Sequence, residues 1–264
     1  MIFFSQATTA LNAHLIGNDG QFTRFITDTR QIQAGDLFVA LRGERFDGGE
    51  FVTQAIAAGA VAALVHPETA VKLAQYTAFC AHPVALIVVS DTRLALGQLA
   101  AYWREQFEIP LIGLTGSNGK TTVKEMIARI LRVSVGNEAV LATQGNLNND
   151  IGMPLMLGRL NSQHRFAVIE MGMNHTGEID YLTRIARPTV ALINNASGAH
   201  LAGLGTVAAV ARAKGEIFAG LPESGIAIIN ADDSYAPLWR ELACAHTLIE
   251  FSLNAAAYSS ILPA

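Results

Sequence analysis

The stretch 113–122, GLTGSNGKTT, places two glycines and a lysine between two different hydrophobic patterns. The apolar run at 109–114 before it has the length of a short buried strand. After it, apolar residues recur at the spacing of one helix face: Val123, Met126, Ile127, Ile130 and Leu131. A strand that turns directly into a helix points the free N–H groups of the first helical turn at the intervening loop. The pattern therefore predicts a phosphate-binding loop within an α/β fold.

The residue types in this loop suit an anion. Gly116 and Gly119 let the main chain pass close to a phosphate, Lys120 would reach the outer phosphates, and a threonine hydroxyl would bind Mg²⁺. The full pattern G-x-x-x-x-G-K-[ST] is not met, because Leu114 stands at the position of its first glycine. A plain helix-capping turn is the alternative, and the strand and helix on either side favour nucleotide binding instead.

Composition limits the other function classes. The formal net charge of −4 gives no electrostatic case for nucleic acid, and no apolar run is long enough to insert in a membrane. The first residues lack the basic flank of a signal peptide, and Cys80 and Cys244 have no metal-type spacing. We expect a soluble, cytoplasmic protein, with both cysteines as buried thiols in a reducing compartment.

Residues 1–83 form the first predicted domain, a small α/β unit. Strands are expected at 22–27, 36–41 and 61–65, and helices at 49–58 and 68–79. Polar residues gather in two of its turns, TDTR, with Thr27, Asp28 and Arg30, and RGERFDGG, with Arg45 and Asp47. Such turns are either solvated and internally paired, or they form a small pocket with arginines for a phosphate and an aspartate for a base or sugar hydroxyl. A second DTR begins at Asp91, where a helix cap is the better interpretation.

Residues 84–264 form the second predicted domain, in which strands and helices alternate. Strands are expected at 85–89, 109–114, 166–170, 189–193, 225–229 and 247–251, with helices at 92–107, 176–186, 206–219 and 234–243. This alternation predicts a P-loop-type, mostly parallel sheet with helices on both faces. Ligands of such sheets bind beyond the carboxyl ends of the strands, which directs attention to the polar residues there.

Several polar residues follow these strands. Glu170 ends the run FAVIE, where a carboxylate commonly supports Mg²⁺, although a helix cap or an exposed strand end is the alternative. His200 lies beyond the strand at 189–193, although a lone histidine is more often structural. The asparagines of the loop TQGNLNNDIG are turn formers that also suit a polar ligand, and Asn230 could contact a base.

Lys214 lies on the apolar face of its helix, seven residues after Val207. A lysine is almost never fully buried without a partner. Three explanations follow: it reaches the edge of the helix, it pairs with a carboxylate, or its lowered pKa leaves a free amine for chemistry. The residues alone favour the first two together.

Taken together, these residues are similar to the Mur ligase family of ATP-dependent amide-forming enzymes. The similarity covers most of the chain, through TDTR, GDLFVALRGERFDG, LTGSNGKTTVKEM, TQGNLNNDIGMPL, VIEMGMNHTGEI, NNASGAHL, ARAKGEIF and INADD. The resemblance implies that the phosphate loop without the first glycine of the general pattern is the form normal for this family. TQGNLNNDIG and AKGEIF favour the member that joins D-alanyl-D-alanine to UDP-N-acetylmuramoyl-tripeptide in peptidoglycan precursor synthesis.

The resemblance implies a role for each candidate. Adenine of ATP would face Asn230, and the ATP phosphates would lie against Thr115, Gly116, Ser117, Asn118, Gly119, Lys120, Thr121 and Thr122. One Mg²⁺ is implied at Thr121 and Glu170 and a second at His200, with Lys214 carbamylated by CO₂ as an anionic metal ligand. Lys120, His200 and Lys214 are the implied catalytic residues. The UDP-linked substrate would contact Thr27, Asp28, Arg30, Arg45, Asp47, Asn146 and Asn149.

The implied reaction passes through an acyl phosphate, which the amine of the dipeptide attacks. Family members carry a third, C-terminal domain, and we expect this chain, as a monomer, to lack its contacts with ATP and the dipeptide. Two alternatives therefore stay open: a non-catalytic nucleotide- or UDP-sugar-binding fragment, and a sister ligase that adds a different amino acid. A folate polyglutamylating enzyme or a generic P-loop kinase would leave the first domain unexplained.

Overall fold

The computed structural model describes residues 1–43, 46–77, 85–198 and 201–253. The chain divides into two compact units, Met1–Trp103 and Arg104–Ala264. The first unit thus extends beyond residue 83, where the sequence pattern placed its end.

The first unit contains a five-stranded sheet. Its order is β2 (His14–Ile16), β9 (Ala85–Val88), β8 (Ala62–Val65), β5 (Asp36–Val39) and β4 (Arg24–Ile26). The pairs from β4 to β9 are parallel, and β2 runs antiparallel to β9. Our assignment of the strand at 85–89 to the second domain is therefore wrong. An apolar run predicts a buried strand, but it does not say which sheet will accept it.

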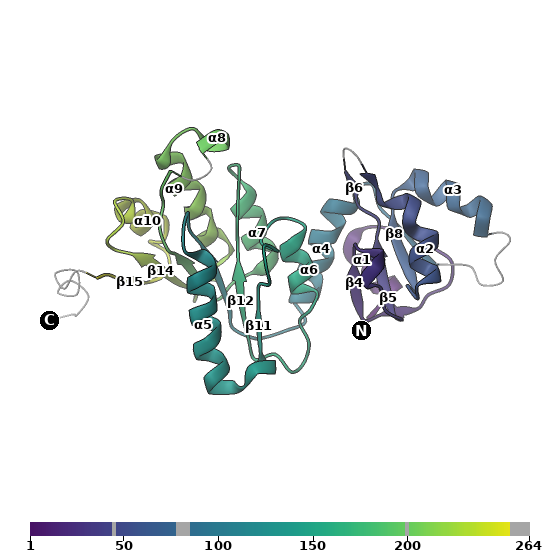
Figure 1. The fold of residues 1–264 in the computed structure, drawn as a ribbon, viewed down its shortest axis with the longest axis horizontal. Helices are drawn as coiled ribbons and strands as arrows, with labels where there is room; N and C mark the ends of the chain where they lie inside the picture. The colour runs from purple at the N-terminus through teal and green to yellow at the C-terminus, as the bar shows by residue number, and fades with distance from the viewer. Residues whose placement is uncertain (44–45, 78–84, 199–200, 254–264) are drawn as a thin grey trace. The chain divides into compact units, whose positions relative to one another are not determined.

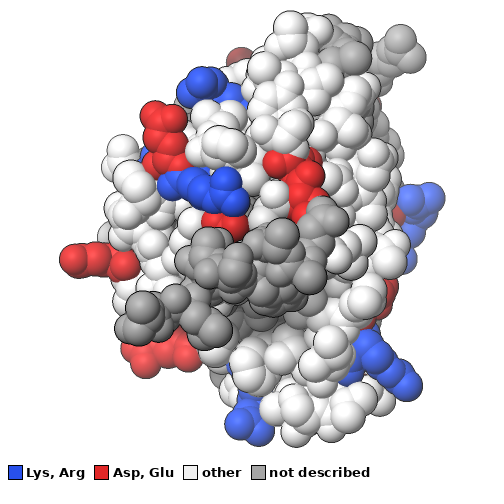
Figure 2. Space-filling model, turned by 90° about the vertical axis from the view of Figure 1, so that its left-hand side faces the viewer, with Lys and Arg blue, Asp and Glu red and all other residues white. Residues whose placement is uncertain are grey.

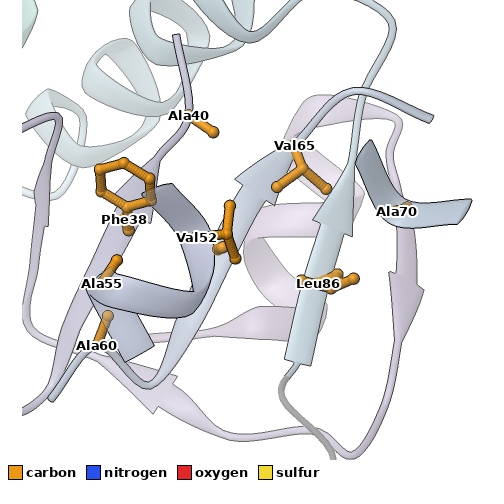
Figure 3. Close-up of a cluster of buried hydrophobic side chains, with 9 residues drawn as sticks. Phe38, Ala40, Val52, Ala55, Ala60, Val65, Ala70 and Leu86 are labelled. Atoms are coloured by element: carbon orange, nitrogen blue, oxygen red, sulfur yellow. The ribbon is translucent and has the colours of Figure 1, made fainter. Parts of the chain in front are cut away.

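Small apolar residues from this sheet and its helices form the core of the first unit, shown in Figure 3. Phe38 and Val65 of the strands pack with Val52 and Ala55 of α2 (Val52–Ala57). The remaining elements are β1 (Ile2–Phe3), α1 (Phe4–Leu11), β3 (Gln21–Phe22), η1 (Thr29–Gln31), β6 (Arg42–Gly43), β7 (Phe46–Asp47), η2 (Gly48–Phe51) and α3 (Pro67–Thr77).

Helix α4 (Thr92–Arg104) begins as the sequence predicts. Asp91 Oδ1 accepts hydrogen bonds from the N–H groups of Arg93 and Leu94, at 2.8 and 2.9 Å. This is the pattern of an N-cap, because the side chain satisfies donors that have no intrahelical acceptor. The interpretation of the second DTR as a cap is confirmed.

The second unit is built on a parallel six-stranded sheet (Figure 1). Its order is β11 (Val140–Ala142), β12 (Phe166–Glu170), β10 (Leu111–Thr115), β13 (Val190–Ile193), β14 (Ile226–Asn230) and β15 (Thr247–Phe251). Every neighbouring pair is parallel. The phosphate-loop strand β10 lies inside the sheet between β12 and β13, so their carboxyl ends meet at one edge.

Helices cover both faces of this sheet. On one face α5 (Lys120–Val135) packs through Val123, Ile127 and Leu131 against a core that includes Leu114 and Val168. On the other face, a Cβ added to Gly113 would lie 3.2 Å from Pro188, which follows α7. The further elements are η3 (Asn137–Ala139), α6 (Gly152–Leu157), α7 (Glu178–Ala186), α8 (Leu201–Leu204), α9 (Val207–Gly215), η4 (Glu216–Gly220) and α10 (Ala236–Leu242).

The predicted stripe on α5 is only partly buried. Met126 and Ile130 are 60% and 68% exposed, because their row of the helix turns away from the sheet.

Cys244 is exposed, so its prediction as a buried thiol is wrong, and Cys80 lies outside the described residues. In the described part of the chain no helix is both long and apolar enough to cross a membrane. On the face shown in Figure 2, basic and acidic side chains are interspersed rather than sorted by sign.

Candidate nucleotide site

The phosphate loop connects β10 directly to α5, as the sequence predicts. Gly119 has φ +72°, a conformation that glycine adopts without steric strain. Gly116 passes close to the end of β13, where an added Cβ would lie 3.0 Å from Asn194 Cβ. Lys120 Nζ donates to Gly116 O at 2.8 Å, so the lysine lies over the loop. Both glycines are therefore required by the path of the main chain.

Residues after β13 hold the outer part of this loop. Asn195 Oδ1 accepts from the N–H groups of Ser117 and Asn118, at 3.1 and 2.9 Å. The amides of Asn194 and Asn195 both donate to Asn118 O, and Ser197 N donates to Ser117 Oγ at 2.9 Å. These contacts engage the N–H groups of Ser117 and Asn118 before any ligand arrives.

The donors left for an anion lie at the start of α5. The first intrahelical bond there runs from Val123 N to Gly119 O, so the N–H groups of Lys120, Thr121 and Thr122 have no acceptor within the helix. They point outward at the positive end of the helix dipole. Of the predicted phosphate-binding residues, these three thus offer donors that the helix does not use, whereas the N–H groups of Ser117 and Asn118 are bonded to Asn195.

Glu170 lies next to this helix start and is 2% exposed. Its Oε2 accepts from Thr121 Oγ1 at 3.0 Å, and its Oε1 accepts from Asn148 Nδ2 at 2.9 Å. Its backbone N–H donates to Thr143 Oγ1 at 2.9 Å. Among the described residues no cation pairs with this carboxylate. A buried carboxylate held only by neutral donors keeps lone pairs that suit a hard cation.

Mg²⁺, which the family resemblance implies, fits these donors. Thr121 and Glu170 supply a hydroxyl and a carboxylate, and the Thr115 hydroxyl is buried without a hydrogen-bond partner in the described structure. No group of three or more metal-binding side chains forms among the described residues, and His200 lies outside them. Mg²⁺ sites in nucleotide enzymes commonly use one or two protein ligands, with phosphates and water completing the shell.

Lys214 is buried in α9, with 1% of its surface exposed. Its Nζ has no hydrogen-bond or ion-pair partner among the residues that the structure describes. Burial lowers the pKa of Lys214 to about 7, with a smaller contribution from the neighbouring charge of Lys120. The interpretation that Lys214 reaches solvent at the edge of the helix is wrong, because the whole side chain is buried. Burial and the charge of Lys120 both disfavour a cation at Lys214, so its surroundings favour a neutral or anionic group there.

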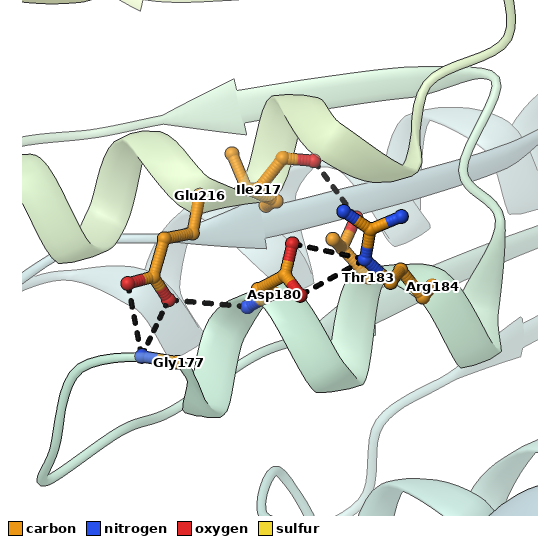
Figure 4. Close-up of polar contacts among 6 residues, drawn as sticks. All are labelled: Gly177, Asp180, Thr183, Arg184, Glu216 and Ile217. Atoms are coloured by element: carbon orange, nitrogen blue, oxygen red, sulfur yellow. Dashed lines mark hydrogen bonds and ion pairs between the residues drawn. The ribbon is translucent and has the colours of Figure 1, made fainter.

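The nearest carboxylate in sequence, Glu216, is used elsewhere. Figure 4 shows it over the start of α7, where it accepts from Gly177 N at 2.9 and 3.0 Å and from Asp180 N at 3.2 Å. A carboxylate at a helix N-terminus is favourable, because it meets free N–H groups and the positive end of the dipole. Thr183 Oγ1 donates to Ile217 O at 2.7 Å and locks α7 against η4. Glu216 thus fixes α7 and does not neutralise Lys214.

Asn230 belongs to the same edge of the sheet. Its Nδ2 donates to Asn194 O at 3.1 Å, and its Oδ1 accepts from Asp232 N at 3.0 Å. Asp233 Oδ2 accepts from Ala196 N at 2.8 Å. The ends of β13 and β14 are therefore joined to the phosphate loop by one hydrogen-bond network.

The loop 143–152 contributes one asparagine to the Glu170 site, and it is not one of the two that we singled out. Asn149 Oδ1 accepts from Gly152 N at 2.8 Å and serves the start of α6, and Asn146 is exposed. Asn148 contacts Glu170 instead. The sequence contained no signal that separates three asparagines within four positions, because the choice depends on the path of the loop.

Two further residues escaped the sequence analysis. Lys124 is 2% exposed, and its Nζ donates to Thr143 O at 2.6 Å. A signal was present, because Lys124 lies four and seven residues before the apolar Ala128 and Leu131 and so shares their helix face. Thr143 directly follows β11 and had no sequence signature of its own.

The first unit has a separate pocket of about 400 Å³ beside TDTR. It is lined by Thr27, Asp28, Thr29, Arg30, Phe38, Phe46, Phe51 and Gln54. Asp28 pairs with Arg30 at 2.7 Å, and these hydrogen bonds lower the pKa of Asp28 to about 2. The rings of Phe46 and Phe51 stack with centroids 5.1 Å apart. The turn is thus internally paired, as the first interpretation expects, and it also borders a pocket with aromatic walls.

The second predicted turn of this unit is described only in part. Asp47 Oδ1 accepts from Gly49 N at 2.8 Å, and its Oδ2 pairs with Arg42 at 3.3 Å. Asp47 lines a second pocket of about 290 Å³ with Lys72 and Thr69. Arg45 lies outside the described residues.

Comparison with known proteins identifies the family of the chain. The model described as "Mur ligase middle domain" matches residues 114–262, and "Mur ligase family, catalytic domain" matches residues 23–104. The UDP-N-acetylmuramoyl-tripeptide–D-alanyl-D-alanine ligase of Escherichia coli is 48% identical over 255 residues, 97% of this chain and 53% of that protein.

Two solved structures show the same fold. MurF from Acinetobacter baumannii aligns with a TM-score of 0.81 at 40% identity, over 94% of this chain and 52% of that chain. MurF ligase from Thermotoga maritima, in complex with ADP, aligns with a TM-score of 0.72 at 30% identity, over 87% and 50%. The chain spans about half the length of the curated relatives it matches.

Proposed function

Because the chain belongs to the Mur ligase family, we propose that it carries the ATP- and UDP-substrate-binding parts of a D-alanyl-D-alanine-adding ligase. The reaction joins D-alanyl-D-alanine to UDP-N-acetylmuramoyl-tripeptide in the cytoplasm, with conversion of ATP to ADP and phosphate. The full-length relatives are named as ligases for this reaction, and we assign the reaction to this chain from the residues of its nucleotide site.

The observation that carries the proposal is the buried amine of Lys214, whose pKa is lowered by burial and, to a smaller extent, by the charge of Lys120. A pKa of about 7 leaves a large fraction of the amine unprotonated at neutral pH. The unprotonated amine can add to CO₂ and release a proton, which converts a cation into a carbamate anion. That product explains an otherwise unfavourable buried lysine, and it provides the anionic metal ligand that the family resemblance implies.

In the proposed reaction, the terminal carboxylate of the tripeptide attacks the γ-phosphorus of ATP, and ADP leaves. The amine of D-alanyl-D-alanine then adds to the acyl carbon and loses a proton, and collapse of the tetrahedral intermediate expels phosphate. The free N–H groups at the start of α5 bind the ATP phosphates, and Lys120 lies where it can offset their charge. Thr121 and Glu170 would hold Mg²⁺, which offsets the repulsion between the carboxylate and the phosphates.

The pocket beside TDTR is proposed for the uridine diphosphate. Phe46 and Phe51 offer apolar ring surface for a base, and Thr27, Asp28 and Arg30 offer polar groups for the ribose and phosphates. Arg45 and Asp47 are proposed to complete this subsite, Asn230 to face adenine, and His200 to bind a second Mg²⁺.

Calorimetric titration tests this proposal without needing the rest of a longer ligase. The chain is titrated with UDP-N-acetylmuramoyl-tripeptide, with the dipeptide form as the control, and separately with ADP and MgCl₂. Binding of the tripeptide form in preference to the dipeptide form supports the D-alanyl-D-alanine-adding ligase. Preference for the dipeptide form would favour a sister ligase, and binding of neither UDP-linked compound nor ADP by a folded sample would refute the proposal.

A further inference from the structure

Lys124 is a buried lysine that the proposed chemistry does not use. It lies on α5 three residues after Thr121 and is 2% exposed. Its Nζ donates to Thr143 O at 2.6 Å and pairs with Glu125 Oε1 at 2.8 Å. Burial of an ammonium group is unfavourable unless such partners compensate for lost water. A lysine at this position therefore needs a reason beyond packing.

Thr143 is the residue that Lys124 holds, and all its polar groups are engaged. Its N–H donates to Val168 O at 3.0 Å, its carbonyl accepts from Lys124, and its hydroxyl accepts from Glu170 N. Thr143 is 1% exposed and directly follows β11. Thr143 thus holds the chain that leaves β11 against the end of β12, whose last residue is Glu170.

These contacts close a ring that starts and ends on α5. Lys124 bonds the carbonyl of Thr143, the hydroxyl of Thr143 bonds the backbone of Glu170, and the Glu170 carboxylate accepts from Thr121. The loop that leaves Thr143 also delivers Asn148 to the other carboxylate oxygen. Each link of the ring therefore restricts where the Glu170 carboxylate can point.

We propose that Lys124 is a positioning residue for the metal-binding carboxylate, acting through Thr143 on Glu170. The inference rests on the proposed function, because it takes Glu170 as a ligand of Mg²⁺. A charge-assisted bond to a carbonyl is stronger and more directional than an apolar contact of the same size. Groups that orient a metal ligand commonly change metal affinity by about 10- to 100-fold when they are removed.

The test measures how much Mg²⁺ tightens the binding of ADP. ADP is titrated calorimetrically into the chain in MgCl₂ and, separately, in EDTA, and the ratio of the two dissociation constants is the coupling. Lys124→Met and Thr143→Val remove the two links. Thr143→Ser keeps the hydroxyl and should therefore show wild-type coupling. Arg129→Met removes an exposed cation from the same helix and serves as the matched control for Lys124→Met.

We expect Lys124→Met and Thr143→Val each to reduce the coupling by about ten-fold, while affinity for ADP in EDTA stays at the wild-type value. Retention of full coupling by both variants would overturn the inference, as would an equal loss of ADP affinity with and without Mg²⁺, which indicates a merely structural role. Thermal unfolding checks each fold, and if Lys124→Met does not fold, the Thr143 pair decides. A wild-type chain whose ADP binding ignores Mg²⁺ would instead refute the proposed function and remove the premise of this inference.

Discussion

Replacement of Lys214 by methionine should stabilise the chain while removing a group that the proposed chemistry needs. The side chain is 1% exposed, and burial lowers its pKa from 10.5 to about 7. A pKa difference of that size corresponds to roughly 5 kcal/mol of unfavourable free energy in the native state, which is an upper bound for the gain. We expect Lys214→Met to raise the free energy of unfolding by about 2–5 kcal/mol at pH 7.

The pH dependence identifies the cause. Between pH 7 and 10.5 the unfolded chain keeps the proton on Lys214 and the native chain does not, so wild-type stability rises with pH in that window. The advantage of Lys214→Met should therefore be largest at pH 7 and below. It should shrink by about 1.4 kcal/mol per pH unit above pH 7.

Urea unfolding at pH 6.5, 8 and 9.5 in CO₂-free buffer measures this difference. Lys72→Met, at an exposed lysine, should change stability little at any pH. Added bicarbonate should stabilise the wild type and leave Lys214→Met unchanged, because carbamate formation removes the buried cation. A variant that is no more stable than the wild type, or whose advantage does not vary with pH, would refute the reasoning.

Three further changes test other contacts. Glu170→Gln should weaken Mg²⁺-dependent ADP binding by on the order of 10- to 100-fold, seen calorimetrically, and a wild-type metal response would exclude this carboxylate as a ligand. Asp91→Ala should cost about 1 kcal/mol in urea unfolding through loss of the α4 cap, and an unchanged midpoint would show that the cap is not needed. Gly152→Ala should destabilise by about 1–3 kcal/mol, because its Cβ would lie 2.5 Å from Leu147 Cα, and a neutral effect would show that the loop can shift.

The nucleotide site could be predicted to the extent that it depends on local pattern. The phosphate loop, Glu170 and five strands of the six-stranded parallel sheet lie where spacing and periodicity indicated, whereas β11 was not expected. These features are local, because a strand, a turn and a helix in succession fix their own geometry.

The features that escaped prediction depend on contacts between distant segments. Which asparagine of the loop 143–152 meets Glu170, and which sheet accepts β9, are decided by tertiary pairing. Lys214 shows the same limit. Its sequence position placed it on the apolar face of the helix, but it did not show that the side chain has no hydrogen-bond or ion-pair partner among the described residues. A residue's place on an element can thus be derived from the sequence, whereas its partners need the fold.

The contacts between Asn195 and the phosphate loop have a consequence for the thermodynamics of nucleotide binding. Because the N–H groups of Ser117 and Asn118 are already bonded, the loop has given up conformational entropy during folding, and a nucleotide need not order it again. Those two amides should consequently exchange slowly with deuterium in the ligand-free chain, while the amides of Lys120 to Thr122 should become protected only when phosphate binds.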